Sequence, residues 1–237
     1  MLRVLLILGV ILTVLKSAWA GEDRPVSQQM KAHQEKSDCW VNVKIAEHVF
    51  RIPNRHNTYV SKRDGSGGDL AHGICHPSNS AAIDADSLSF FPQYLPGYEP
   101  EVIQPIETET RMGFAVQIII DTYPENYFPW LEFAGVKRNL DEAGIELADL
   151  PKQNGFYVYR GTQYISMNEN FITASGEPVV IMGTRHRYST IFPWKDELRI
   201  RIRSINDLYI PQEEWKDFYY LVLDYMEALE ITAGENN

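Results

Sequence analysis

One amphipathic segment near the end of the chain restricts the fold more than any other feature. Between residues 211 and 230, large apolar side chains recur every three or four positions, which places them on one face of an α-helix. Pro211 suits a first helical position, Glu213 and Glu214 place negative charge at the positive helix end, and Gly234 suits a stop. The apolar positions are Trp215, Phe218, Tyr219, Val222, Tyr225, Met226 and Leu229. Such a face needs an apolar surface to cover it.

The residues just before this helix offer that surface. Leu198, Ile200 and Ile202 alternate with three arginines, which is the period of a β-strand with one apolar and one cationic face. We expect the apolar face to lie under the helix and the arginine face to be solvated or to face a partner. Residues 156–159 and 178–182 are typical of further strands. The sequence therefore predicts an α+β fold, an antiparallel sheet meander packed against a C-terminal amphipathic helix.

Earlier segments extend this unit. Turn residues and prolines bound each of them. The predictions are a hairpin over 40–45 and 49–52, an irregular aromatic loop over 84–98, a central strand over 113–121 and a short helix over 140–150. No linker or internal repeat divides the chain, so we expect residues 39–237 to form a single domain.

The first 20 residues have the composition of a secretory signal peptide. Arg3 precedes an apolar run over 4–15, and Ala18-Trp19-Ala20 has the small-x-small pattern of a cleavage site. The run is shorter than the ~20 residues that span a bilayer, so we expect no membrane insertion after cleavage. The predicted organisation is a signal peptide over 1–20, a flexible N-terminal arm over 21–38 and the domain that follows.

The charge of the exported chain excludes one class of partner. Without Arg3 and Lys16, 20 basic residues remain against 32 acidic ones, a net charge of −12. Nucleic-acid binding depends on neutralising phosphates, which an acidic protein does poorly. A basic protein surface is the better match, although acidity also serves solubility alone.

Two cysteines, Cys39 and Cys75, follow the leader. In an oxidising compartment a disulfide between them is the default expectation. A bond that closes a loop of this size would stabilise the fold by about 4 kcal/mol. A reactive thiol is the alternative, which the absence of a Cys-x-x-Cys motif disfavours.

Two short segments have residue types that could support chemistry. In the glycine-rich tip over 62–69, Asp64 and Asp69 could offer oxygen ligands to calcium, but the tip lacks the twelve-residue loop and its terminal Glu. His72 and His76 have helical spacing for zinc, but Gly73 and Pro77 oppose a helix there. We therefore assign no metal, cofactor or catalytic residue.

Loops with aromatic and acidic side chains are the candidates for partner binding. Aromatic residues concentrate binding energy at interfaces, and charges at the rim set association rates. The candidate residues are Asp64 and Asp69 in the tip, Phe91 and Tyr94 in the aromatic loop, and Glu99, Glu101, Glu107 and Glu109 in the acidic segment that follows.

The order of several short segments resembles a known family. The segments are Cys-Trp-Val-Asn-Val at 39–43, Val-Phe-Arg-Ile-Pro-Asn at 49–54, Asp-Leu-Pro at 149–151 with Gly-Phe-Tyr-Val-Tyr at 155–159, and Glu-Trp at 214–215 before the final helix. Together they resemble periplasmic immunity proteins that neutralise interbacterial toxins, especially those encoded beside lipase-type effectors of type VI secretion systems. The resemblance implies a periplasmic location, an α+β fold and tight binding to a cognate toxin. It implies no particular functional residue.

Three hypotheses about function follow. The first is a binding protein that inhibits a cognate toxin, and it fits the acidity, the loop aromatics and the absence of a recognisable catalytic motif. The second is a periplasmic hydrolase with a dispersed site built from His72, His76 and either Asp64 or Asp69. The third is a non-catalytic envelope protein.

The disulfide prediction is tested by mass. Intact protein from the periplasm, analysed without reductant, should be two hydrogens lighter than the reduced chain, because Cys39 and Cys75 are each other's only partner after the leader. Replacing both by Ser should lower the thermal midpoint and leave the fold intact. Two free thiols in the exported protein would contradict the prediction.

Overall fold

The computed structural model describes nine ranges of the chain: residues 40–53, 58–62, 64–69, 80–92, 116–122, 128–184, 187–195, 197–204 and 210–231. These ranges contain all the helices and strands discussed below. Cys39 and Cys75 lie outside them.

The described residues form a ten-stranded sheet in the order β4-β3-β6-β7-β13-β12-β11-β10-β9-β8. Every neighbouring pair is antiparallel. The strands are β3 (Tyr59–Ser61), β4 (Gly67–Asp69), β6 (Ser87–Phe90), β7 (Val116–Asp121), β8 (Lys152–Gln153), β9 (Phe156–Tyr159), β10 (Gln163–Ser166), β11 (Val180–Thr184), β12 (Arg187–Pro193) and β13 (Arg199–Ser204). Strands β8 to β13 form an uninterrupted meander, and β7 joins it beside β13, as expected of a central strand.

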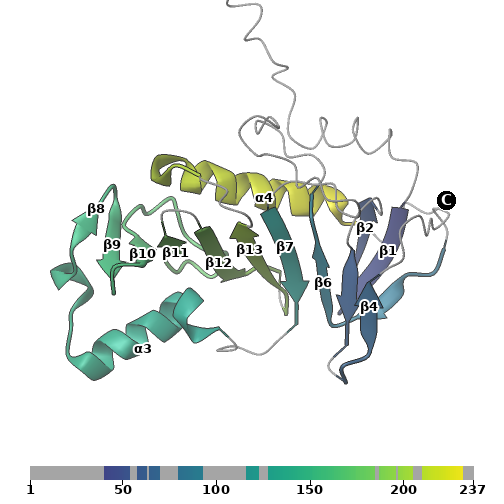
Figure 1. The fold of residues 1–237 in the computed structure, drawn as a ribbon, viewed down its shortest axis with the longest axis horizontal. Helices are drawn as coiled ribbons and strands as arrows, with labels where there is room; N and C mark the ends of the chain where they lie inside the picture. The colour runs from purple at the N-terminus through teal and green to yellow at the C-terminus, as the bar shows by residue number, and fades with distance from the viewer. Residues whose placement is uncertain are drawn as a thin grey trace, which may run out of the picture.

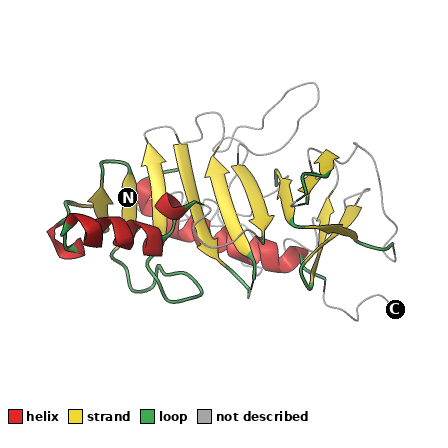
Figure 2. Cartoon of the chain, turned by 90° about the horizontal axis from the view of Figure 1, so that it is seen from below, coloured by secondary structure: helices red, strands yellow, loops and turns green. Residues whose placement is uncertain are grey.

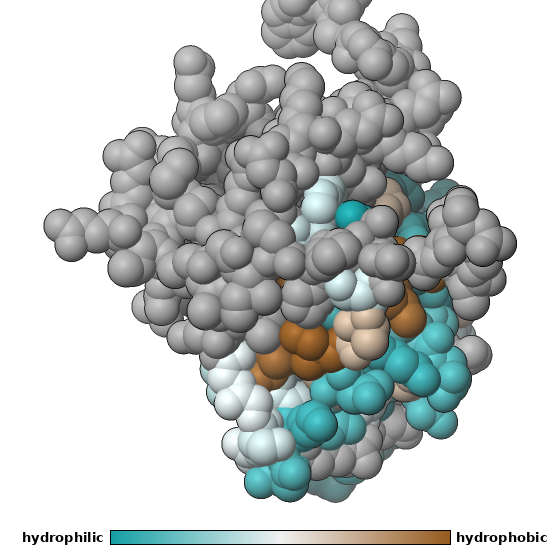
Figure 3. Space-filling view, turned by 90° about the vertical axis from the view of Figure 1, so that its right-hand side faces the viewer, coloured by the Kyte–Doolittle hydropathy of each residue, from teal (hydrophilic) through white to brown (hydrophobic). Residues whose placement is uncertain are grey.

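A second, three-stranded sheet lies at one end of the first (Figure 1). Its order is β2-β1-β5, with β1 (Trp40–Ile45) antiparallel to β2 (His48–Pro53) and parallel to β5 (Ile83–Ala85). This confirms the predicted hairpin. Figure 3 faces this end of the molecule and shows a small hydrophobic band with hydrophilic residues below it and to its right on the described surface.

Helix α4 (Trp215–Leu229) lies along one face of the large sheet, across its strands (Figures 1 and 2). All seven apolar positions predicted for the helix are buried. They share one apolar cluster with Leu198, Ile200 and Ile202, so the apolar side of this strand faces the helix, as predicted. The predicted α+β architecture, an antiparallel meander packed on a C-terminal amphipathic helix, is confirmed.

Trp215 occupies a central position in this packing. Its ring lies 5.5 Å from Phe156, 5.2 Å from Tyr164 and 5.5 Å from Tyr188, and its indole N–H donates to the Ile210 carbonyl at 2.9 Å. A side chain at Gly183 would place its Cβ only 2.7 Å from the Trp215 ring. Helix and sheet therefore approach closely where the strand carries glycine.

Helix α3 (Phe133–Ala143) lies on the opposite face, at the β8–β11 end of the sheet (Figure 1). Its buried side chains form a separate apolar cluster with those strands and the residues after the helix. The members are Val136, Leu140, Leu150, Tyr159, Ile165 and Val180. No described helix covers the same face over β6, β7 and β13.

Several predicted boundaries were wrong. The helix predicted over 140–150 is α3, which ends where Gly144 adopts the left-handed conformation, and only a 3-10 turn, η2 (Leu147–Asp149), follows. The irregular loop predicted over 84–98 begins with strands instead, because most of β5 and all of β6 fall within it. Pro211 is not in the α-helix but precedes the 3-10 turn η3 (Gln212–Glu214). Element boundaries such as these depend on packing between distant segments, which local residue preferences do not show.

Two tryptophans allow a matched test of this packing. Trp215→Ala should lower the free energy of unfolding by about 3–5 kcal/mol, because it removes a buried ring and leaves a cavity. Trp130→Ala, at a side chain that is 45% exposed, should change it by about 0.5 kcal/mol or less. Urea unfolding measures both. Equal losses would show that Trp215 does not anchor the helix.

Candidate partner-binding surface

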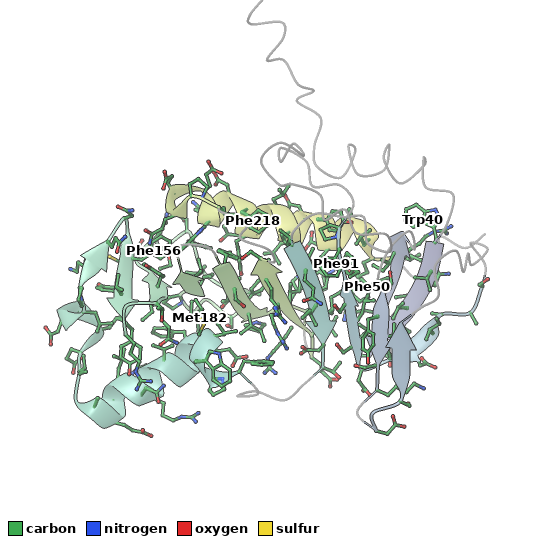
Figure 4. The ribbon with its side chains drawn as sticks, viewed as in Figure 1. Trp40, Phe50, Phe91, Phe156, Met182 and Phe218 are labelled. Atoms are coloured by element: carbon green, nitrogen blue, oxygen red, sulfur yellow. The ribbon has the colours of Figure 1, made fainter. Side chains whose placement is uncertain are left out.

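The site residues predicted from sequence are only partly described. Phe91 follows β6 directly and is half-buried (Figure 4). Asp69 is the last residue of β4, where only its backbone is described. The remaining predicted residues lie outside the described ranges: Tyr94, Glu99, Glu101, Glu107 and Glu109, together with His72 and His76 of the alternative hydrolase site. For these residues the assignments stay predictions.

Asp64 stabilises a turn. It lies exposed between β3 and β4, and the backbone N–H of Ser66 donates to its Oδ1 at 2.8 Å. Hydrogen bonds from the side chain and backbone of Ser66 lower the pKa of Asp64 below its usual value. Among the described residues, no group of three or more His, Cys, Asp or Glu could hold a metal ion. The observed role of this carboxylate is to close its own loop.

The structure brings together a different set of residues on the face opposite α4. Arg199, Arg201 and Arg203 of β13 point away from the helix, as their alternation with the buried isoleucines requires. Across the ladder they pair in register with Asp121, Ile119 and Gln117 of β7. We call this part of the sheet, with the turn over residues 128–132 that packs on it, the arginine face.

Two ion pairs organise the arginine face. Arg201 Nη2 lies 3.2 Å from Asp121 Oδ2, and the exposed fractions of the two side chains are 12% and 2%. Arg199 Nε lies 3.2 Å from Glu132 Oε1. The Arg201 guanidinium also lies 3.7 Å from the centre of the Phe128 ring, a cation–π contact. The Arg201–Phe128 contact and the Arg199–Glu132 ion pair hold the two ends of the 128–132 turn against the sheet.

This turn presents Trp130 to solvent. The 3-10 turn η1 (Pro129–Leu131) contains it, and the buried Gln163 side chain donates to its backbone carbonyl. A Cβ at Gly135 would lie 1.8 Å from the Pro129 carbonyl oxygen, so α3 packs directly on the turn. The Trp130 ring meets the edge of Phe128 at 5.6 Å and is 45% exposed. It is a large apolar side chain on a well-supported backbone.

Arg203 gives the arginine face its exposed charge. Its cross-strand neighbours are Gln117 on β7 and Ser189 on β12. Met182 on β11 is the next residue in the same row, opposite Ser189 (Figure 4). Arg203 is exposed, and the other three are partly exposed. No ion pair joins Arg203 to a described residue. Within the described part of this face, two carboxylates, Asp121 and Glu132, form ion pairs with two of the three arginines.

Sequence reasoning missed Trp130 and Arg203 as site residues. The alternation of 198–203 did indicate a solvated or partner-facing cationic side, and Phe128-Pro129-Trp130 is an aromatic cluster interrupted by proline. Neither pattern shows which aromatic side chain remains exposed. The exposure of Trp130 depends on Gln163, which is distant in sequence, and on Gly135, which no predicted element contained.

Comparisons with known proteins leave the family open. No protein-family model and no curated protein sequence matches this chain. Among solved structures, the iron-regulated outer membrane lipoprotein FrpD of Neisseria meningitidis aligns with a TM-score of 0.36 and 9% identity, over 81% of this chain and 93% of that chain. A likeness this distant carries no conclusion about function. No helix within the described ranges is long and apolar enough to cross a membrane.

The arginine face yields a test with a control on the same strand. Arg201→Ala should lower the free energy of unfolding by about 3 kcal/mol, because it leaves the Asp121 carboxylate buried without this partner. Arg203→Ala removes an exposed guanidinium and should change it by about 0.5 kcal/mol or less. Chemical unfolding compares the two. A small effect of Arg201→Ala would show that the pair does not stabilise the fold.

Proposed function

We propose that this chain is an exported periplasmic immunity protein, which binds a cognate antibacterial toxin of the lipase type and neutralises it. The observation that supports this best is the exposed Trp130 on a turn fixed by Gln163 and Gly135. The signal-peptide pattern of residues 1–20 and the resemblance to immunity proteins supply the location and the class of partner.

Trp130 has the properties of a binding anchor. A few aromatic side chains, Trp foremost, supply most of the energy of a typical interface. Because η1 is already held in place, little conformational entropy is lost when a partner covers the ring. Arg203 and Gln117 lie in the same face and provide polar groups for a rim. A partner that fits would place an apolar pocket over Trp130 and a carboxylate near Arg203.

The acidic segment gives the proposed interface a second part. Glu99, Glu101, Glu107 and Glu109 would attract a basic region of the toxin and raise the association rate, whereas Arg203 would attract an acidic group. A toxin with one basic and one acidic region would be oriented by the acidic segment and Arg203 together.

No described feature favours the alternative hydrolase. Of the residues proposed for that site, only Asp64 has its side chain within the described ranges, and there it accepts hydrogen bonds from Ser66 inside its own exposed turn. The envelope-protein hypothesis predicts no tight partner, so the binding experiment below also separates it from the proposal.

The binding test uses the toxin encoded beside this gene, or else the protein that co-purifies with this chain from the periplasm. Trp130→Ala should raise the dissociation rate by a factor equivalent to about 2 kcal/mol or more. Ile145→Ala is the control, because Ile145 is 39% exposed and lies beyond the C-terminal end of α3. Association and dissociation rates are measured by surface plasmon resonance on variants with equal thermal midpoints.

Protection of cells from the toxin is the second measurement. Trp130→Ala should reduce protection, and Ile145→Ala should retain it. Equal binding and equal protection by both variants would remove Trp130 from the interface. Failure of the wild-type protein to bind or protect would overturn the proposed function itself.

A further inference from the structure

A cluster of charged side chains joins three distant parts of the chain. Glu230, just after α4, lies between two basic groups. Its Oε1 is 2.6 Å from His48 Nδ1 at the start of β2, and its Oε2 accepts a hydrogen bond from Lys195 Nζ in the turn between β12 and β13. All three side chains are partly buried. We call His48, Lys195 and Glu230 the Glu230 cluster.

Aromatic side chains support both basic groups. Lys195 Nζ lies 4.8 Å from the centre of the Trp194 ring, and the Trp194 ring lies 5.9 Å from that of Phe50. His48 stacks on Phe50 with ring centres 6.4 Å apart. Both bases are therefore held near Glu230 by packing as well as by charge.

The backbone at this position also joins β2 to the residues that follow α4. The Ile231 N–H donates to the Val49 carbonyl at 2.8 Å, and Phe50 forms an isolated antiparallel bridge with Glu230. These contacts occupy part of the edge of β2, which is the outer strand of the three-stranded sheet. The position of the β1–β2 hairpin relative to α4 therefore depends on residues 230 and 231.

The charge state of Glu230 decides how the cluster behaves. Burial by itself raises the pKa of Glu230, but hydrogen bonds and charge from Lys195 and His48 outweigh it, so the pKa lies below its ordinary value of 4.5. A lowered carboxylate pKa means that the contact stabilises the fold above this ordinary value, and that the stabilisation is lost as the pH falls through the lowered one.

Protonation of Glu230 would do more than remove an attraction. Neutralising Glu230 leaves Lys195 and His48, the two groups that lower its pKa, on either side of an uncharged carboxyl group. Charged residues close to the cluster in sequence include Lys44, Glu47, Glu197 and Glu227, and Lys44 pairs with Glu47 at 3.6 Å. Within the described residues, none of these four makes an ion pair with a member of the cluster.

We propose that the Glu230 cluster is an acid-sensitive contact that holds the β1–β2 hairpin on the C-terminal end of α4. Acidification releases the hairpin and residues 230–231 from each other while the ten-stranded sheet stays folded. Helix α4 contains no member of this cluster, so its apolar contact with the large sheet does not depend on Glu230. The hairpin shares the same apolar core through Phe50 and Ile52, so acidification loosens the hairpin at its β2 edge rather than detaching it. The inference does not depend on the identity of any binding partner.

Hydrogen exchange with mass spectrometry on the full exported chain tests this device. Protection is measured between about pH 7 and about pH 3, corrected for intrinsic exchange rates, and compared between residues 40–53 and residues 187–204. In the wild type, protection of 40–53 should fall first, by up to about tenfold per pH unit between the ordinary carboxyl pKa of 4.5 and the lowered pKa of Glu230. Simultaneous loss in both segments would overturn the proposal.

Variants distinguish protonation of Glu230 from protonation of other groups at low pH. Glu230→Gln should lower protection of 40–53 already at neutral pH and remove the extra loss at acid pH. Glu227→Gln, on the last turn of α4, is the control and should keep the wild-type profile. His48→Gln keeps the Lys195 contact but removes one cation, so release should occur at higher pH. Profiles of Glu230→Gln and His48→Gln identical to the wild type would refute the inference.

Discussion

The packing of α4 on one face of the large sheet is the constraint on which the rest of the structure depends. Strands that are distant in sequence, such as β7 and β13, lie side by side under this one helix. Burial of its seven apolar side chains provides the main driving force for that arrangement. Trp215 fits over Gly183, where the strand offers no side chain. Helix position and strand register are thereby fixed together.

The two faces of the sheet consequently have different roles. One face is fully used to build the core, and polar groups there would remain unpaired. Within the described residues, a helix covers the other face only at the β8–β11 end, where α3 lies, which leaves room for charged side chains on β7 and β13. Buried ion pairs contribute little net stability compared with apolar packing, but they specify geometry in some proteins. Here they position the turn that presents Trp130, which links the fold to the proposed binding role.

Much of the fold could be predicted because its signals are local. The period of three to four in α4 and the period of two over 198–203 both lie within single elements. Strand β6 was mistaken for loop, because its burial depends on pairing with β7. The candidate site was less accessible to sequence reasoning. Exposure of Trp130 depends on Gln163 and on the approach of α3, and His48 meets Glu230 across 182 residues. Neither contact has a spacing that could be recognised.

The position of α4 in the chain also affects when folding can finish. Every described strand precedes this helix in sequence, so each of them is synthesised before the surface that covers its apolar face exists. A chain that crosses a membrane N-terminus first would therefore stay loosely structured until α4 arrived. Secretion machinery that threads unfolded polypeptides would benefit from such a delay, and chaperones would need to shield the exposed isoleucines of β7 meanwhile. The helix that completes the core would thus set the moment at which the protein becomes compact.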